Sequence, residues 1–184
     1  MKTSRILIIA LALLPVFAKA QDRYMTRNGH VTFLSETPME NIAADNNTAS
    51  SVWDATSGSV ELAVLIKAFE FEKALMQEHF NENYMESNKF PKATFKGKVT
   101  GVTADQLKKQ GTYPAVVEGT LTMHGVPQPV KISATVVVDA SGKVTASGDF
   151  TVKAEDYKIE IPKLVRKNVA EQIKVSVRLD YQKM

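Results

Sequence analysis

Hydrophobic and polar residues alternate with a period of two along most of the chain, most clearly between Gly119 and Val138. Such a period places apolar side chains on one face of a β-sheet and polar side chains on the other. Gly125 lies within this stretch and frees the backbone to reverse. Pro127 and Pro129 belong at the turn or where the next strand begins, because proline cannot donate to a β-ladder. The segment predicts a β-hairpin with one apolar and one polar face.

The same alternation recurs through the rest of the chain and predicts further strands. The predicted strands span residues 24–35, 58–71, 93–102, 112–124, 130–139, 143–153, 156–161 and 173–181. The composition of Asp139-Ala-Ser-Gly142 favours a turn. Seven or eight strands are enough to close a barrel and remove its unpaired edges. The fold class is therefore predicted to be mainly β, a closed antiparallel β-barrel of about eight strands.

Three segments break the period of two. Residues 36–59 are rich in Asn, Thr, Ser and Ala, and predict a long loop with one helical turn near residues 39–43. Residues 72–83 predict a short helix, because Leu75, Met76, His79 and Phe80 share one side of it. Residues 162–171 predict a second short helix, which begins at a proline. Two helices between the strands of a barrel form either a lid over its mouth or a plug that completes its core, and the pattern leaves both open.

Residues 1–20 have the form of a signal peptide. Lys2 and Arg5 precede an apolar stretch at residues 6–17, which is too short to span a bilayer comfortably, and Ala18-Lys19-Ala20 is a small-residue cleavage box. We expect cleavage after Ala20 and export to the bacterial periplasm or beyond, with a retained membrane anchor as the alternative. Residues 21–184 then form one domain. The chain contains no cysteine, so an oxidising compartment imposes no disulfide chemistry on it.

The net charge of +3 overstates how basic the exported protein is. Three of the 23 basic residues, Lys2, Arg5 and Lys19, lie in the predicted signal peptide, which leaves 20 to balance the 20 acidic residues. A nearly neutral domain has no overall basic field to attract nucleic acid or anionic lipid. We therefore expect no nucleic-acid partner.

Alternation alone does not decide whether the apolar face points into a barrel or outward into lipid. The two helical segments, the long charged connections and the non-aromatic C-terminal Met184 argue against an outer-membrane barrel. The many lysines and carboxylates on the polar face argue the same way. We expect a soluble barrel with an apolar interior and no stable membrane insertion.

Three stretches resemble a known family. Phe90-Pro-Lys-Ala-Thr-Phe-Lys-Gly97 and Gly119-Thr-Leu-Thr-Met-His-Gly-Val-Pro-Gln-Pro-Val130 are similar to two motifs of the YceI-like proteins, and residues 148–159 are similar to a third. The resemblance covers the whole of residues 21–184. It implies a lipocalin-like barrel of the bacterial envelope that binds polyisoprenoids. The chain departs from the family pattern where Ala154 replaces an arginine and Lys158 replaces a glycine, so head-group contacts are expected to differ there.

The resemblance and the inward parity of the strands together predict a cavity that binds an isoprenoid or quinone, with no cofactor. Small residues beside the bulky ones either leave space for a tunnel or merely permit tight packing; with the family resemblance we expect a tunnel. These small residues are Ala93, Gly97, Ala115, Gly119 and Ala134. The predicted cavity-lining residues are Phe33, Phe80, Phe95, Tyr113, Leu121, Met123, Ile132, Phe150, Tyr157 and Ile159.

The chain offers few candidates for catalysis. Its histidines, at positions 30, 79 and 124, are isolated, and neither a nucleophile elbow nor a metal-binding histidine motif is present. We expect His124 to be a solvated turn residue, and His79 to cap the core or line the mouth. The leading hypothesis is therefore non-enzymatic carriage or sequestration of a lipid, with no catalytic or metal site. The alternatives are an enzyme that uses His79, His124 or a carboxylate on an apolar substrate, and a packed barrel whose loops bind a partner; a homodimer is compatible with each.

Overall fold

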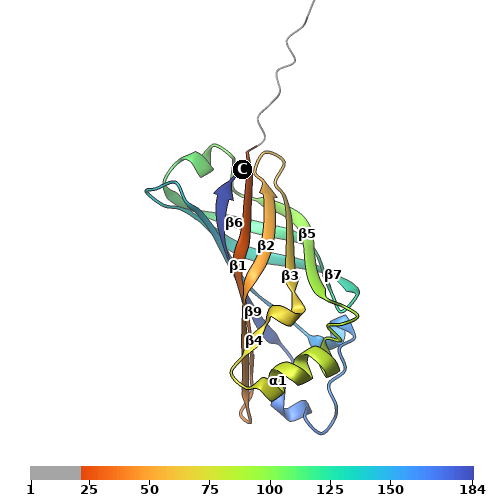
Figure 1. Ribbon diagram of the computed structural model, residues 1–184. Coiled ribbons are helices and arrows are strands. Elements are labelled where there is room, and N and C mark those ends of the chain that lie inside the picture. The colour runs from red at the N-terminus through yellow and green to blue at the C-terminus, as the bar shows by residue number, and fades with distance from the viewer. Residues whose placement is uncertain (1–21) are drawn as a thin grey trace, which may run out of the picture.

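The computed structural model describes residues 22–184, so the predicted signal peptide lies outside the described residues. Eight antiparallel strands close into a barrel, as predicted, and a ninth, very short strand pairs with β2 (Figure 1). The strands are β1 (Arg23–Glu36), β2 (Asn41–Asp54), β3 (Ser59–Leu65), β4 (Glu70–Phe71), β5 (Lys92–Thr100), β6 (Gly111–Met123), β7 (Val126–Val138), β8 (Val144–Val152) and β9 (Ile173–Lys183). One α-helix, α1 (Ala74–His79), continues as a π-helical stretch over Phe80–Tyr84.

The strand order around the barrel is β1-β9-β8-β7-β6-β5-β3-β2, and pairing of β1 with β2 closes it. The predicted hairpin is β6–β7, which is paired from Met123↔Val126 to Gly111↔Val138. Both turn residues, His124 and Gly125, have positive φ, at 52° and 74°. This matches the tight turn that suits the twist of two antiparallel strands. The two prolines lie in the first residues of β7, a stretch flanked by β6 but not by β8, so their missing N–H groups cost no ladder bond there.

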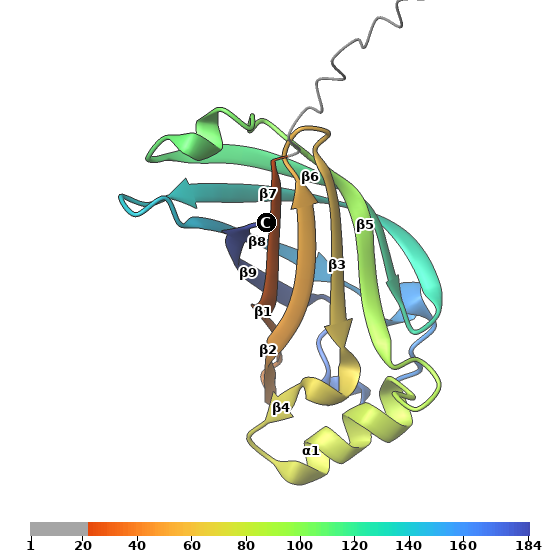
Figure 2. The same ribbon diagram turned by 45° about the horizontal axis from the view of Figure 1, so that its top comes forward.

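The connections at the two ends of the barrel differ in length. At one end, called the closed end, β2–β3, β5–β6 and β7–β8 are joined by at most ten residues, with one 3₁₀ turn at Gln106–Lys108. At the other end, called the mouth, residues 66–91 join β3 to β5 and residues 153–172 join β8 to β9. Figures 1 and 2 show α1 and the β8–β9 connection at this same end, away from the C-terminus. The two long connections therefore cover one end of the barrel.

The prediction of a long loop over residues 36–59 was wrong, because most of it forms strand β2. Its buried positions hold mainly small or polar residues, among them Ala44, Asn46 and Ser51, so no hydrophobic alternation marks the strand. The register with β1 also shifts twice along the pair. At one shift Asn46, which is fully buried, donates from Nδ2 to the carbonyl of Leu65 at 2.9 Å and accepts from the N–H of Thr48 at 2.9 Å. The hydrogen bonds of the buried Asn46 side chain thus stabilise this bulge in the barrel wall.

Three further segments differ from their predictions. The predicted strand over 58–71 ends at Leu65 and gives way to a 3₁₀ turn before β4. The predicted strand over 156–161 is absent from the described chain: Ala154–Tyr157 form a 3₁₀ turn that ends at Lys158 with φ of 56°. The second predicted helix shrinks to a turn and a 3₁₀ stretch at Arg166–Asn168. The helix predicted over 72–83 is confirmed. Alternation over a few residues did not distinguish a strand from an irregular segment with one buried side.

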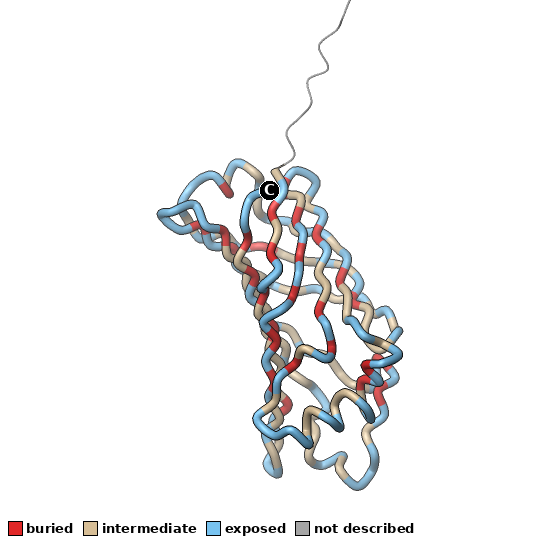
Figure 3. The backbone as a smooth tube through the Cα atoms, in the orientation of Figure 1, coloured by how far each residue is buried: buried red, intermediate tan, exposed pale blue. Residues whose placement is uncertain are grey.

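Trp53, at the closed end, is one of the two most completely buried aromatic side chains of the described residues. Trp53 is 2% exposed and lies between Tyr24 and Tyr181, with ring centroids 6.0 and 5.8 Å away. Ser51 donates to the carbonyl of Glu61 at 2.8 Å, so the Tyr181 hydroxyl, 2.8 Å from Ser51, donates to it. Burial raises the pKa of Tyr181 to about 12. In Figure 3 buried positions alternate with exposed ones along these strands.

Candidate functional site

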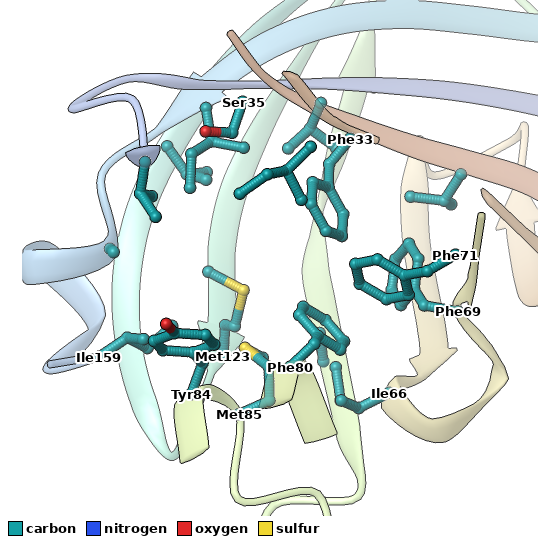
Figure 4. Close-up of a pocket in the computed structure, with 18 of the residues that line it drawn as sticks. Phe33, Ser35, Ile66, Phe69, Phe71, Phe80, Tyr84, Met85, Met123 and Ile159 are labelled. Carbon is teal, nitrogen blue, oxygen red and sulfur yellow. The ribbon is translucent and has the colours of Figure 1, made fainter. Parts of the chain in front are cut away.

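A cavity of about 280 Å³ lies inside the mouth half of the barrel (Figure 4). This volume approaches the lower end of the roughly 300–1,000 Å³ that is usual for small-molecule pockets. Its walls come from strands β1, β2, β3, β5, β6, β8 and β9, and from both long connections. The lining residues include Val31, Ile42, Leu62, Val64, Ala93, Leu121, Phe150, Val152, Ile173, Val175 and Val177 from the strands, and Met76, Met85, Ile159, Ile161, Val165 and Val169 from the connections.

A second, smaller cavity of about 100 Å³ lies deeper, toward the closed end. Four residues line both cavities: Leu62, Leu121, Phe150 and Val177. The deeper cavity is lined by aliphatic side chains such as Val130 and Ala146, and by Trp53 and Tyr181 at its far end. The barrel interior is therefore hollow in two adjoining places, separated by side chains that face both.

Four phenylalanines form one wall of the larger cavity. Phe33 stacks on Phe80 with ring centroids 5.4 Å apart, and its ring meets those of Phe69 and Phe71 edge-on. Phe71 and Phe80 are also in contact, at 5.0 Å. Figure 4 shows these rings gathered on one side of the cavity, opposite Ile159 and Tyr84. Aromatic rings in such contacts make a stable apolar surface with few rotatable bonds.

The polar groups of the cavity lie toward the mouth. Glu40, in the β1–β2 turn, accepts a hydrogen bond from Asn168 Nδ2 at 3.0 Å and lies 3.6 Å from Lys73 Nζ. Ser35 Oγ, which is buried, accepts the backbone N–H of Ala170 at 2.8 Å. Glu40, Asn168 and Ser35 all line the cavity, together with His79 and Tyr84. The site therefore has a deep apolar part and a polar part near its entrance, which suits an amphiphilic molecule.

A model of the YceI-like domain matches residues 24–181 of the sequence. The chain belongs to the YceI-like family. The sequence resemblance is confirmed, and it covers nearly all of the described chain. No curated protein matches the sequence.

Solved structures share the YceI-like fold. A polyisoprenoid binding domain from Saccharophagus degradans, implicated in plant cell wall breakdown, aligns with a TM-score of 0.74 at 17% identity, over 90% of this chain and 100% of its own. Burkholderia cenocepacia BcnA aligns at 0.67 and 16% identity, over 84% and 96%. The Campylobacter jejuni YceI protein aligns at 0.54 and 14% identity, over 100% and 99%. At these identities the likeness establishes a common barrel.

Most of the predicted cavity residues of this YceI-like barrel lie beside the two cavities. Six line the larger one: Phe33, Phe80, Leu121, Met123, Phe150 and Ile159. Phe95 and Ile132 line the smaller one. Tyr113 and Tyr157 line neither. The Tyr113 hydroxyl donates to the carbonyl of Lys109 at 3.0 Å near the closed end, and Tyr157 packs into the core from its 3₁₀ turn, where burial raises the pKa of its hydroxyl.

Several cavity residues were not predicted. Phe69 and Phe71 lie just past the end of β3, where the predicted strand continued, and their inward direction depends on the 3₁₀ turn at Ile66–Ala68. Val165 and Asn168 come from a connection with no repeating pattern. The one usable signal was Met76, which shares the apolar side of the predicted helix with Phe80 and lines the cavity with it. Both long connections therefore form part of the cavity wall, as a lid over the mouth would.

The small residues inside the barrel have two different roles. Ala93 lines the larger cavity, and Ala115 and Ala134 line the smaller one. Gly97 and Gly119 leave no such space: they pair across β5 and β6, and a Cβ at Gly119 would lie 2.7 Å from the ring of Phe95 and against the carbonyl oxygen of Lys96. The expectation that these glycines open a tunnel was wrong, because Phe95 covers them.

His124 is not a solvated turn residue, as its outward parity had suggested. Only 11% of its side chain is exposed, and its ring meets that of Phe90 edge-on at 4.5 Å. Nδ1 lies 3.2 Å from the carbonyl oxygen of Tyr157, which can only accept, so Nδ1–H donates. Nε2 lies 2.8 Å from Glu86 Oε2. His124 therefore ties the β6–β7 turn to both connections that cover the mouth.

The two departures from the family pattern both fall in this part of the barrel. Ala154, in place of the family's arginine, lines the cavity and brings no charge to it. Lys158, in place of glycine, has the left-handed backbone (φ 56°) that glycine adopts without strain. Lys158 therefore occupies a conformation that suits glycine better, whereas Ala154 changes the chemistry of the cavity wall.

Proposed function

We propose that this protein binds, without catalysis, a single amphiphilic molecule with a long isoprenoid tail, and carries or sequesters it in the bacterial envelope. The observation that carries the proposal is the apolar cavity of about 280 Å³, whose polar groups lie at its mouth. Membership of the YceI-like family and the shared fold of a polyisoprenoid binding domain support it. The tail lies along the phenylalanine wall, and the head group lies near Ser35, Glu40 and Asn168.

Burial of hydrocarbon supplies the affinity. Each buried methylene contributes about 0.8 kcal/mol, so one five-carbon isoprene unit contributes roughly 3–4 kcal/mol before ordering costs. A few units therefore suffice for tight binding without any hydrogen bond. A longer tail reaches the deeper cavity of about 100 Å³ when Leu121 and Phe150, which face both cavities, change rotamer.

An uncharged head group, such as a quinone, phenol or alcohol, suits this mouth best. No lysine or arginine is among the residues of the described chain that line the cavity, and Ala154 stands where the family has arginine. The Glu40 carboxylate lines the cavity and would repel a phosphate placed beside it. We expect a polyprenol to bind at least as tightly as the polyprenyl phosphate of the same length in parallel titrations. Clearly tighter binding of the phosphate would contradict the uncharged head group and leave the tail site standing.

Mass spectrometry of an organic extract of the purified protein tests the proposal directly, because a carrier retains its lipid. The delipidated protein is then titrated with a long-chain isoprenoid. Ala93→Trp fills the cavity from strand β5, whereas Lys92→Trp places the same side chain on the exposed neighbour. We expect saturable binding that Ala93→Trp abolishes and Lys92→Trp preserves. Absence of saturable binding to the unmodified protein would overturn the proposal.

The proposal of a non-enzymatic role rests on the ionisable groups of the cavity. Glu40 is already bonded to Asn168 and paired with Lys73, and His79 is exposed on α1. We expect the lipid recovered after long incubation to be chemically identical to the lipid that was added. A product that forms with the unmodified protein and disappears in His79→Gln or Glu40→Gln would show an enzyme instead.

Envelope localisation is proposed from the features of residues 1–20, which lie outside the described residues. Among residues 22–184, no helix is long and apolar enough to cross a membrane. Cell fractionation followed by N-terminal sequencing tests the localisation. We expect the protein in the periplasmic fraction or the medium, with Gln21 as its first residue. A chain that keeps residues 1–20 and sediments with membranes would show a retained anchor.

A further inference from the structure

Three large apolar side chains project into solvent around the mouth. Leu164 is 97% exposed, Met39 70% and Leu75 61%. Leu164 belongs to the β8–β9 connection, Met39 to the β1–β2 turn and Leu75 to α1, and all three of these segments lie at the same end of the barrel (Figures 1 and 2). A single exposed apolar residue is ordinary, whereas several gathered at one end indicate an interaction surface. These three residues are called the apolar rim.

The segments that carry the apolar rim also supply residues of the cavity wall. Glu40 joins its three segments, since it is bonded to Asn168 of the β8–β9 connection and paired with Lys73 at the start of α1. The next residue along the chain from Leu164, Val165, lines the cavity, and so does Met76, which follows Leu75. Neighbouring residues therefore face in opposite directions, one into the cavity and one into solvent.

Positive charge accompanies the most exposed rim residue. Residues 162–168, called the mouth lobe, carry Lys163, Arg166 and Lys167 around Leu164 and contain no acidic residue. All three cations are exposed. The α1 side of the mouth is more acidic: Glu72 just before the helix, Glu78 on α1 and Glu82 on the π-helical stretch are exposed, against one exposed lysine in residues 72–84, Lys73. A nearly neutral domain thus has a local basic and apolar projection on one side of its cavity entrance.

We propose that the mouth lobe docks the protein on the surface of an anionic lipid bilayer, with Leu164 inserted among the lipids and the three cations at the head groups. Apolar side chains flanked by lysine and arginine are the usual means of such interfacial binding. The anionic bilayer repels the acidic α1 side and so tilts the barrel. The mouth lobe therefore contacts the bilayer first, and Met39 contacts it next. The inference rests on the proposed function, because docking brings the cavity entrance to the source or destination of its lipid.

Vesicle flotation of the purified protein tests the docking surface without any isoprenoid. We expect it to float with phosphatidylglycerol–phosphatidylethanolamine vesicles and not with phosphatidylcholine vesicles. Leu164→Ser should weaken binding about fivefold or more, and the triple variant Lys163→Gln, Arg166→Gln, Lys167→Gln roughly tenfold or more. The matched controls are Val52→Thr with Val137→Thr, which change exposed valines of the barrel wall, and Arg27→Gln with Lys98→Gln and Lys109→Gln, which remove the same charge elsewhere. Each control should bind vesicles like the unmodified protein.

Any of four results would overturn the docking inference. The first is that the unmodified protein does not float, and the second is that the mouth-lobe variants float as well as the unmodified protein. The third is that the control variants lose as much vesicle binding as the mouth-lobe variants, and the fourth is that the lobe captures a protein partner without binding vesicles. Isoprenoid titration in solution separates this inference from the proposed function. Mouth-lobe variants should keep their solution affinity while they accept isoprenoid from anionic vesicles more slowly. Vesicle binding without isoprenoid binding would overturn the proposed function and leave the docking surface intact.

Discussion

The two ends of the barrel use aromatic side chains in opposite ways. At the closed end, Trp53 is sealed between two tyrosines, and the Tyr181 hydroxyl is bonded to a buried serine. At the mouth, Phe33 and Phe80 are in comparable ring contacts but stay only partly buried, because one side of each faces the cavity. Ring contacts of one kind therefore seal the far end of the deeper cavity with almost fully buried side chains, whereas at the mouth they form one wall of the larger cavity.

A small barrel can be both stable and hollow when its two ends differ in this way. A cavity forfeits packing contacts along its lining, which lowers stability. The closed end offsets part of this loss by burying Trp53, Tyr24 and Tyr181 almost completely. Lys183, near the C-terminus, also forms an ion pair with Asp22 at the surface of this end, which contributes little to stability. The hydrogen bond from Lys183 lowers the pKa of Asp22. Substitutions at the closed end should therefore change stability, and substitutions at the mouth should change binding.

Removal of the buried indole should have the largest effect on stability. Trp53→Ala should lower the free energy of unfolding by about 3–5 kcal/mol, because it deletes a buried aromatic side chain and extends the deeper cavity. Urea unfolding monitored by circular dichroism measures this change. Trp53→Phe serves as the control: Nε1 has no hydrogen-bond partner among the described residues, so loss of the N–H costs little and the decrease should be less than half as large. Equal losses in the two variants would contradict the packing explanation.

Alkaline pH should destabilise the protein, with the largest contribution from Tyr181 at the closed end. Between pH 10 and about 12 the folded protein keeps the Tyr181 proton that the unfolded chain releases, because burial raises the pKa of the Tyr181 hydroxyl from 10.0 to about 12. Stability is thus fully present below pH 10 and falls as pH rises through this window, by about 2–3 kcal/mol from this group. Urea unfolding at several pH values measures the slope, which should be shallower in Tyr181→Phe. Burial also raises the pKa of Tyr24 and Tyr157, so some slope remains in that variant. Equal slopes would contradict a special contribution of Tyr181.

Loss of the tie at the mouth should have a smaller effect on stability. His124→Ala removes the hydrogen bonds to the Tyr157 carbonyl and to Glu86, and should cost about 1–2 kcal/mol. Hydrogen exchange should quicken in residues 85–90 and 154–158, because the two connections are no longer held to the β6–β7 turn. His79→Ala, which changes an exposed histidine of α1, should alter stability by less than about 0.5 kcal/mol. Unchanged exchange at both connections in His124→Ala would show that they are held by other contacts.

Sequence patterns predicted the fold well wherever apolar residues marked one face of a strand. The β6–β7 hairpin and strand β9 follow this rule, and their predicted positions agree with the structure. Strand β2 escaped prediction because Ala44, Asn46 and Ser51 occupy its buried positions, and its bulges shift the period. Small and polar residues give no hydrophobic alternation even when tertiary contacts bury them.

The candidate site was predictable only in part, for a related reason. Strand parity correctly placed residues such as Leu121 and Phe150 beside the cavities. It misplaced Tyr157, which lies in a 3₁₀ turn, where alternation does not apply. The walls supplied by the two long connections depend on how irregular backbone folds over the mouth. Contacts such as those of His124 with Tyr157 and Glu86 fix that path, and they join residues more than 30 positions apart.

The smallest effect on stability is expected at α1, where one residue faces the cavity and its neighbour in the chain faces solvent. Met76 lines the cavity and Leu75 does not. Met76→Ala should change the free energy of unfolding by less than about 1 kcal/mol, because Met76 is only half-buried and alanine favours the helix. Its isoprenoid affinity should nevertheless fall about five- to tenfold, as expected for the loss of one apolar contact with the tail. Leu75→Ala is the matched control, and its affinity in solution should equal that of the unmodified protein. If both variants bound isoprenoid as tightly as the unmodified protein, α1 would act as a plug of the barrel end and not as a wall of the binding site.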